Sequence, residues 1–319
     1  MQAIVTIENL TISFSSMYGK NYAVRNLSLQ IPRAKTLGLV GESGCGKSVT
    51  AYSLLHLVPK PGVIEKGSIM YNDMNLLQCP DATLQSIRGK NIAMIFQEPM
   101  TSLNPVFTIG YQVQEAVELH LHLRKAEAKD YTIALLGKAG IPNPSSRYYS
   151  YPHELSGGLR QRAMIAMALA AKPELLIADE PTTALDVTIQ SQILDLLLTL
   201  QKSQHMSMLL ITHDLGIVAN VADVIAIMYA GEIVEIAPTK EIFNNFLHPY
   251  TQGLMSCIPS LHKKTKRLAT IPGTVPIISK PPAGCVFYPR CYRGDANCLH
   301  APVSLIQKNK DHRVRCIKA

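Results

Sequence analysis

The sequence lacks any long hydrophobic run. Its longest uncharged apolar stretch is AMIAMALAA, nine residues at 163–171, whereas a membrane-spanning helix needs about 20 apolar residues. The first residues, MQAIVTIENL, also lack the basic region and apolar core of a signal peptide. We therefore expect a cytosolic chain, or one that is attached to a membrane only through its partners.

An even cysteine count is also missing. The chain has 7 cysteines, and an odd number in a chain without an export signal argues against a disulfide framework. Thiols that stay reduced are free to bind metal. Four of the seven lie among the last 35 residues.

Acidic residues are scarce near the C-terminus. Residues 238–319 hold 13 Lys and Arg against 3 Asp and Glu, whereas residues 1–237 hold 18 against 20. The same segment carries 9 of the 20 prolines. This change in composition predicts a boundary near residue 238, with a large domain before it and a small extension after it.

The apolar pattern predicts an α/β fold. TLGLVG, ELLIAD and SMLLITHD are short continuous apolar runs, typical of strands that are covered on both faces in a parallel sheet. VTIQSQILDLLLTLQ has apolar residues at helical spacing and predicts a crossover helix. DVIAIMYAGEIVEIA predicts two strands joined by a turn at Ala230-Gly231. Residues 98–165 break the alternation of strands and helices and predict a helical insertion.

The segment GESGCGKS, Gly41–Ser48, has the spacing of a phosphate-binding loop between a strand and a helix. Glycines let backbone N–H groups surround phosphate oxygens, and the helix N-terminus adds a favourable dipole. Lys47 is expected to reach the β- and γ-phosphates, and the Ser48 hydroxyl to bind Mg²⁺. Cys45 lies near the helix N-terminus, which should lower the pKa of its thiol. We therefore expect thiol alkylation to block nucleotide binding.

A second element is LLIADE, Leu175–Glu180. An apolar strand that ends in two acids brings Asp179 to the carboxyl edge of the sheet, where Mg²⁺ is expected. Glu180 is then positioned to orient or deprotonate an attacking water.

A third element is ELSGGLRQR at residues 154–162. Ser156 can cap the helix that follows, and Gly157 and Gly158 leave bare backbone N–H groups at its start. Because Gly41–Ser48 already encloses one nucleotide, this second helix N-terminus is expected to serve a nucleotide held by a facing subunit.

In this order the motifs resemble those of ABC-type ATPases. The set also includes Tyr18 in YGKNYAV, Gln97 in FQEP, ALD at 184–186 and His213 in THD. Many members have glutamine at the position of Leu159. The resemblance implies a P-loop ABC-type nucleotide-binding domain over residues 1–237, with the helical insertion at about 98–165. It also implies that ATP lies between the phosphate loop of one subunit and the LSGG segment of another.

The resemblance further implies roles for single residues. Tyr18 would stack on adenine, with Tyr22 as the competing aromatic. Gln97 would sense Mg²⁺ and the γ-phosphate and couple to a membrane partner, and His213 would contact the γ-phosphate. The implied catalytic residues are Lys47, Gln97, Glu180 and His213. The implied Mg²⁺ ligands are Ser48, Gln97 and Asp179. The other nucleotide contacts would come from Gly41, Glu42, Ser43, Gly44, Cys45, Gly46, Val49, Ser156, Gly157 and Gly158.

Beyond residue 237 the chain is similar to ATP-binding subunits of dipeptide/oligopeptide importers, through HPYTQGLMSCIPS (248–260), IPGTVP (271–276) and the cysteine-bearing end. This implies an ATPase at the cytoplasmic face of the inner membrane that powers import of short peptides, with nickel or another small solute as the alternative cargo. The implied partners are two integral membrane permeases, a second, related ATPase subunit and a secreted substrate-binding protein.

Two other classes fit less well. The basic tail suggests a soluble ABC ATPase that acts on nucleic acid or ribosomes. Such proteins usually carry paired nucleotide domains or a long coiled-coil insertion, and this sequence has neither, so no nucleic acid is expected. A P-loop kinase for a small molecule leaves LSGG unexplained.

The C-terminal cysteines have the spacing Cys285-x5-Cys291-x6-Cys298-x17-Cys316, unlike the C-x2-C pairs of common zinc sites. Four thiolates can hold Zn²⁺ or a cubane iron–sulfur cluster, and the residues alone do not separate the two. The resemblance to the importer family favours [4Fe–4S], with zinc or no metal as the alternatives. A Pro-rich extension with few large apolar residues would need such a staple. Four arginines lie beside these cysteines in sequence and would neutralise an anionic cluster, form a solvated face or attract anionic lipid: Arg290, Arg293, Arg313 and Arg315.

Overall fold

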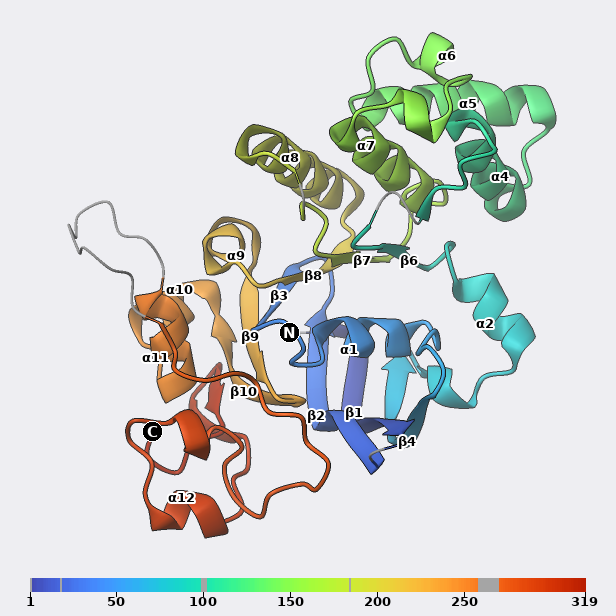
Figure 1. The fold of residues 1–319 in the computed structure, drawn as a ribbon. Helices are drawn as coiled ribbons and strands as arrows, with labels where there is room; N and C mark the ends of the chain where they lie inside the picture. Colours follow the sequence, from blue (N-terminus) through green and yellow to red (C-terminus); the bar gives the residue numbers. More distant parts are fainter. Residues whose placement is uncertain (1, 18, 99–101, 184, 258–269) are drawn as a thin grey trace. The chain divides into compact units, whose positions relative to one another are not determined.

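The computed structural model describes residues 2–17, 19–98, 102–183, 185–257 and 270–319. The chain forms two compact units (Figure 1). Unit 1 comprises Met1–Pro32, Thr36–Gln78 and Leu210–Ala319, and unit 2 comprises Arg33–Lys35 and Cys79–Leu209. Strand β8 (Ser207–Thr212) carries the chain from unit 2 into unit 1.

One sheet of unit 1 is antiparallel, with the strand order β2-β1-β4-β5. β1 (Ala3–Ser16) pairs with β2 (Gly19–Pro32) on one side and with β4 (Gly62–Tyr71) on the other, and β5 (Met74–Asn75) pairs with β4. Apolar residues on β1 and β2 alternate with polar ones and are buried: Val5, Ile7, Leu27, Leu29 and Ile31. The burial of this face holds the sheet together.

Other strands of unit 1 lie side by side in the order β11-β12-β10-β9-β3. β3 (Thr36–Val40) is buried along its whole length and runs parallel to β9 (Val224–Tyr229), as its continuous apolar run predicts. β9 and β10 (Glu232–Pro238) are antiparallel, and the predicted strand pair with its turn at Ala230-Gly231 is confirmed.

The C-terminal residues join this unit through β11 (Ile306–Asn309) and β12 (His312–Val314), because β12 pairs with β10. A buried carboxylate lies at the junction. Glu235 of β10 is fully buried, accepts the backbone N–H of Leu247 at 2.7 Å, and has His312 Nε2 2.7 Å from Oε1. The helices of unit 1 are α1 (Lys47–Leu54), η1 (Leu76–Gln78), α9 (Leu215–Val221), α10 (Thr239–Asn244), α11 (Pro249–Ser256), η3 (Tyr288–Arg290) and α12 (Ala296–His300).

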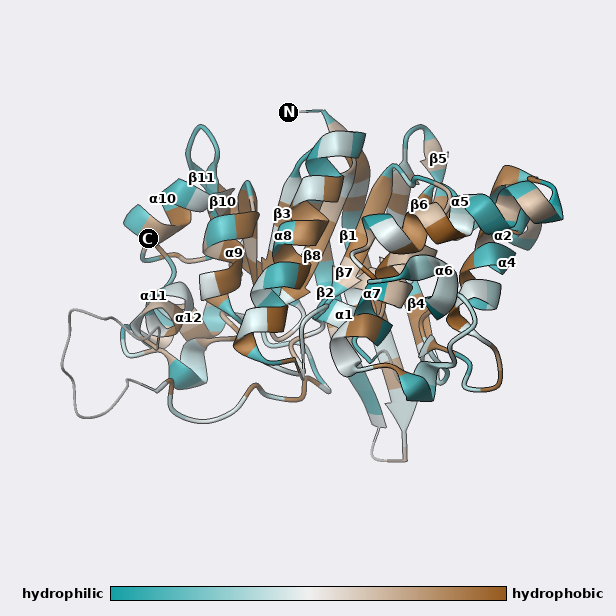
Figure 2. Cartoon of the chain, turned by 90° about the horizontal axis from the view of Figure 1, so that it is seen from above, coloured by the Kyte–Doolittle hydropathy of each residue, from teal (hydrophilic) through white to brown (hydrophobic). Residues whose placement is uncertain are grey.

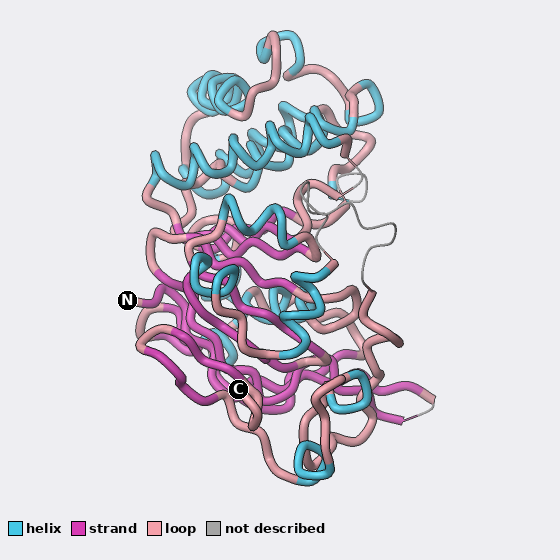
Figure 3. Tube along the Cα trace, turned by 90° about the vertical axis from the view of Figure 1, so that its left-hand side faces the viewer, coloured by secondary structure: helices cyan, strands magenta, loops and turns pink. Residues whose placement is uncertain are grey.

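Unit 2 combines a parallel strand pair with helices. β6 (Ile92–Ile95) pairs in parallel with β7 (Leu175–Asp179). Helices α4, α5 and α7 pack against one another, as the cyan segments of Figure 3 show. The predicted crossover helix is confirmed as a helix, α8, and Figure 2 shows both hydrophobic and hydrophilic residues along it. The helices of unit 2 are α2 (Asp81–Ile87), α4 (Ile109–Leu121), α5 (Lys125–Lys138), α6 (Pro144–Arg147), η2 (Pro152–Glu154), α7 (Gly157–Ala168) and α8 (Val187–Gln204).

Within the described ranges, no helix combines the length and the apolar character needed to cross a bilayer. The domain bounds 1–237, 98–165 and 238–319 stay predictions, although residues 109–121 and 125–138 are helical and residues 270–319 belong to unit 1.

Candidate nucleotide site and four-cysteine cavity

The phosphate-binding loop has the predicted strand–loop–helix context. β3 ends at Val40, and α1 begins at Lys47 with Gly46 as its N-cap residue. Gly46 has φ +108°, and a Cβ there would lie 2.3 Å from the Ala23 carbonyl oxygen. Only glycine therefore fits this position, because another side chain would combine an unfavourable backbone conformation with a clash against backbone.

Lys47 is folded into its own loop. Its side chain is buried, and Nζ donates to the carbonyl oxygens of Gly41 at 2.8 Å and Glu42 at 3.0 Å. No carboxylate of the described residues forms an ion pair with Lys47, so its positive charge is held by neutral acceptors alone. A buried ammonium in that state is a binding partner for a phosphate oxygen.

The other loop residues differ in exposure. Ser43 and Gly44 are exposed, Glu42, Ser48 and Val49 are half-buried, and Cys45 is fully buried.

The expectation for Cys45 was wrong. Burial raises the pKa of its thiol, and this outweighs the lowering caused by the Lys47 ammonium. The helix N-terminus is the weaker influence because the thiol is enclosed by protein. A buried thiol with a raised pKa reacts slowly, so we expect Cys45 to resist alkylation in the folded chain.

The phosphate loop also contacts the C-terminal residues, which the sequence did not predict. The backbone N–H of Glu42 donates to the Tyr250 hydroxyl at 3.0 Å. The Glu42 carboxylate accepts two hydrogen bonds from the Arg290 guanidinium, at 3.0 and 3.1 Å. Tyr250 lies in the sequence HPYT and Arg290 in PRC. Neither short pattern indicates that its residue contacts Glu42.

The acidic strand end in unit 2 has a definite geometry. β7 is buried throughout and ends at Asp179, which is fully buried. Glu180 follows with φ +45° and is half-buried. Its Oε2 accepts hydrogen bonds from Gln97 Nε2 at 3.1 Å and from Thr183 Oγ1 at 2.9 Å. The carboxyl ends of the paired strands β6 and β7 thus bring Gln97 and Glu180 together, as expected for a parallel sheet.

The LSGG segment forms the start of α7 in unit 2. Ser156 is the N-cap residue and is exposed, with Gly157 exposed and Gly158 half-buried behind it. The capping expectation was partly wrong, because the Ser156 side chain makes no cap hydrogen bond. Its hydroxyl therefore faces solvent beside the first N–H groups of the helix, which is suitable for an anionic ligand.

The remaining predicted contacts are less defined. His213 follows β8 in unit 1 and is exposed. Tyr18 and Ala184 of ALD lie outside the described residues. Tyr22, the competing aromatic, is a half-buried residue of β2, and its backbone N–H donates to the Ile278 carbonyl at 2.8 Å.

All seven cysteines are free in the structure. The four C-terminal cysteines line one cavity of unit 1: Cys285, Cys291, Cys298 and Cys316. The pKa of Cys285 is raised to about 11, mainly by burial and to a smaller extent by the neighbouring thiols of Cys291 and Cys316. Burial likewise raises the pKa of Cys291. Four thiolates in this cavity would therefore need a bound cation.

The thiols share a cavity but do not converge on one point. Among the described residues, no three His, Cys, Asp or Glu side chains lie close enough together to hold a single metal ion. The four thiols therefore do not form an assembled metal-ion site among the described residues.

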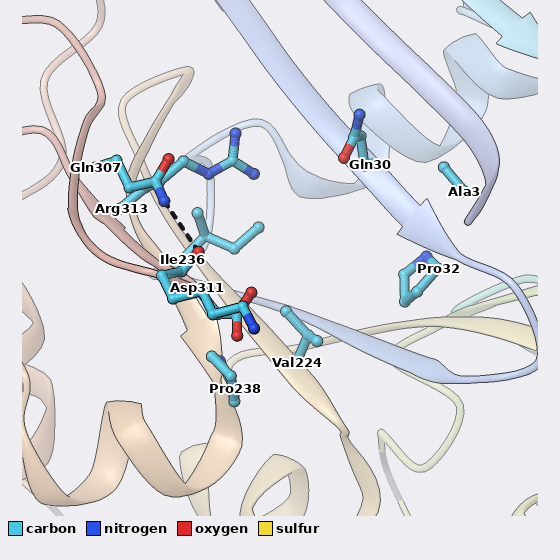
Figure 4. Close-up of a pocket in the computed structure, with 10 residues that line it drawn as sticks. Ala3, Gln30, Pro32, Val224, Ile236, Pro238, Gln307, Asp311 and Arg313 are labelled. Carbon is cyan, nitrogen blue, oxygen red and sulfur yellow. Dashed lines mark hydrogen bonds between the residues drawn. The ribbon is translucent and has the colours of Figure 1, made fainter. Parts of the chain in front are cut away.

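The arginines divide among different contacts. Arg293 lines the cysteine cavity, whereas Arg290 pairs with Glu42, and Arg315 donates to the Ile233 and Val303 carbonyls. Arg313 lies in a separate cavity of about 250 Å³, shown in Figure 4, with Gln30, Val224 and Ile236. Of the four arginines that lie beside the cysteines in sequence, Arg293 is therefore the one that lines the cysteine cavity. No residue predicted for the nucleotide site lines this separate cavity.

Comparison with known proteins gives consistent matches. Residues 24–183 match the family profile described as ABC transporter, and residues 234–298 match that of the oligopeptide/dipeptide transporter, C-terminal region. A dipeptide transport ATP-binding protein of Bacillus subtilis (strain 168) is 44% identical over 317 residues, which cover 99% of this chain and 95% of the relative. An oligopeptide transport ATP-binding protein of the same organism is 48% identical over 286 residues, 89% of this chain and 80% of the relative.

Solved structures are also similar. The dimeric structure of a post-hydrolysis state of an ATP-binding cassette bound to ADP and phosphate has a TM-score of 0.67 at 26% identity, over 74% of this chain and 98% of that one.

Proposed function

Because the chain belongs to the ABC transporter family, we propose that it is the ATP-hydrolysing subunit that powers import of short peptides across the cytoplasmic membrane. One observation carries the peptide cargo: the similarity to relatives named for dipeptide and oligopeptide transport continues through the C-terminal region. The chain is an ATPase, and MgATP is its substrate.

The phosphate loop binds the nucleotide. Backbone N–H groups of Gly41, Glu42, Ser43, Gly44, Cys45, Gly46, Lys47, Ser48 and Val49 would surround the phosphates. Lys47 would exchange the loop carbonyls for phosphate oxygens, because an anionic acceptor makes the stronger hydrogen bond. Mg²⁺ would be held by Ser48, Gln97 and Asp179, and when bound it neutralises charge on the β- and γ-phosphates.

Hydrolysis requires a base beside the attacking water. Glu180 has this role, and its contact with Gln97 at 3.1 Å supports a coupled pair at the γ-phosphate. Gln97 would then report the state of the γ-phosphate to a membrane partner. His213 would contact the same phosphate, and Tyr18 would stack on adenine.

ATP drives a pairing of two nucleotide domains. Ser156, Gly157 and Gly158 would bind the nucleotide of a facing subunit, so ATP favours the closed pair and hydrolysis removes that preference. The partners are a second, related ATPase subunit, two integral membrane permeases at the cytoplasmic face, and a secreted substrate-binding protein. The large domain is residues 1–237, with the helical insertion at 98–165, and the extension is residues 238–319.

The extension would carry a [4Fe–4S] cluster on Cys285, Cys291, Cys298 and Cys316. The cavity that the four cysteines share supports this proposal. Bound there, the cluster would tie together three loops and α12, which have few apolar residues of their own. Absorbance near 400 nm in anaerobically purified protein, lost in Cys291→Ser, supports the cluster. Colourless protein with one zinc per chain contradicts it.

Uptake of a labelled dipeptide tests the function. In cells that lack this gene, the wild-type chain should restore uptake, whereas Glu180→Gln should not. The matched control Cys45→Ala changes a buried side chain of the loop and should restore uptake. Restoration of nickel uptake alone contradicts the peptide cargo. Purification with ribosomes or DNA, and without integral membrane proteins, contradicts the transport function.

A further inference from the structure

Arg290 links the cysteine-bearing extension to the phosphate loop. It ends the short helix η3, directly before Cys291, and both of its terminal nitrogens bond the Glu42 carboxylate, Nη1 to Oε1 at 3.0 Å and Nη2 to Oε2 at 3.1 Å. The Arg290 side chain is 6% exposed and that of Glu42 is 30% exposed. A two-fold contact of this kind fixes direction as well as distance.

The other contacts of Arg290 hold its guanidinium still. Nε donates to the Pro272 carbonyl at 2.7 Å, and Nη2 lies 3.3 and 3.2 Å from the carbonyls of Ile271 and Gly273. The guanidinium carbon lies 5.6 Å from the centre of the Tyr229 ring. Every nitrogen of the side chain is therefore engaged, which few arginines achieve with their five N–H donors.

Glu42 is the loop residue best suited to receive this link. Its carbonyl oxygen accepts from Lys47 Nζ, and its N–H donates to Tyr250 of helix α11. The Tyr250 ring packs with those of Tyr229 and Phe287, at centroid distances of 4.7 and 5.3 Å. Phe287 lies between Cys285 and Cys291 in the sequence. The extension therefore contacts Glu42 in two ways: Tyr250 accepts a hydrogen bond from its backbone N–H, and Arg290 forms a two-fold ion pair with its carboxylate.

We propose that Arg290 is a positioning residue for ATP binding: through Glu42 it holds the phosphate loop in the nucleotide-binding conformation and makes ATP affinity depend on the cysteine-bearing extension. The proposal rests on the proposed ATP-driven function. Arg293 offers a matched control, since it lies in the same segment but donates to the Lys318 carbonyl within the extension.

A double-mutant cycle measures the link. The full-length chain is titrated with a fluorescent ATP analogue and Mg²⁺, as wild type, Arg290→Ala, Glu42→Gln and the double variant. Each single change should weaken binding about tenfold, the usual size of coupling between two sites. The double variant should be no weaker than the weaker single one, because both changes remove the same contact. Arg293→Ala should bind like wild type.

Kinetics and a conservative variant separate positioning from general damage. Arg290→Ala should raise KM for ATP about tenfold with kcat nearly unchanged, because the loop contributes equally to ground and transition states. The KM of Arg290→Lys for ATP should lie between those of wild type and Arg290→Ala, because lysine keeps the positive charge but cannot form the two parallel hydrogen bonds of arginine. Cys291→Ser should weaken ATP binding when it is introduced into the wild-type chain. Introduced into Arg290→Ala, it should cause no further loss of ATP affinity.

Additive effects of Arg290→Ala and Glu42→Gln overturn the proposal, as does wild-type affinity in Arg290→Ala. If Arg290→Ala fails to fold, the cycle is made with Arg290→Lys. If the wild-type chain does not bind MgATP, the proposed function itself is contradicted. Failure of the Arg290 proposal and failure of the proposed function are therefore distinguishable.

Discussion

Two glycines of the phosphate loop should differ sharply in their tolerance of alanine. Gly44 and Gly46 both have positive φ, +79° and +108°. A Cβ on Gly44 meets nothing within 4 Å, whereas a Cβ on Gly46 would lie 2.3 Å from the Ala23 carbonyl oxygen and 2.7 Å from Met228 Cε. Comparing Gly44→Ala with Gly46→Ala therefore distinguishes the effect of backbone strain from the effect of steric contact within one loop.

The magnitudes follow from these two effects. An alanine in the left-handed backbone conformation is about 1–2 kcal/mol less stable than glycine. The free energy of unfolding of Gly44→Ala should therefore fall by this amount and no more. Gly46→Ala adds an overpacking penalty of about 1–3 kcal/mol, because the contacted carbonyl belongs to β2 and cannot move alone. Gly46→Ala should therefore lose about 2–5 kcal/mol in total and bind MgATP weakly, because Gly46 sets the start of α1.

Urea denaturation and MgATP titration of both variants provide the assay. Gly44→Ala should unfold slightly earlier than wild type and keep measurable MgATP affinity, whereas Gly46→Ala should lose most of both. Equal loss of stability and of affinity in the two variants would refute the steric argument, and with it the described position of Ala23 against the loop.

Three further predictions concern a base, a thiol and a buried histidine. Glu180→Gln should bind MgATP as wild type does but release phosphate about 10²–10⁴-fold more slowly in single turnovers; unchanged turnover removes Glu180 from its role. Cys45 should resist iodoacetamide at pH 8 in the folded chain, as peptide mass spectrometry can show, because burial raises its pKa; rapid labelling contradicts that burial. Burial lowers the pKa of His248 to about 3 from its ordinary value of 6.5, so the unfolded chain binds the extra proton between these values. Stability should fall by about 2 kcal/mol between pH 7 and pH 5. His248→Asn, which keeps a cap acceptor for Tyr250 N–H, should lose this pH dependence in urea denaturation; an unchanged pH dependence argues against His248 as the source.

Local patterns predicted the elements that build the nucleotide site. The apolar run before Gly41 becomes a buried strand, and the loop leads into a helix, because glycine spacing and strand burial are both encoded within ten residues. The strand pair around Ala230-Gly231 follows from two apolar runs separated by small turn residues. Strand β6, which pairs in parallel with β7 and brings Gln97 to Glu180, was not among the predicted strands.

Contacts that depend on tertiary packing could not be predicted. The reactivity expected for Cys45 considered the helix N-terminus, but burial has the larger effect on the thiol pKa. The Ser156 hydroxyl has a capping residue's position without a capping bond. Arg290 and Glu42 lie 248 positions apart, and several other arginines and lysines lie near Arg290 in the sequence, so no local pattern selects this pair.

The edge of β10 has a consequence for biosynthesis. Its neighbour β12 supplies the His312 ring beside the buried Glu235 carboxylate from 77 positions downstream. While the chain is still growing on the ribosome, β10 is an uncovered edge strand and Glu235 lacks this neighbour. Nascent chains should thus engage a holding chaperone until β12 has left the ribosome and can pair with β10.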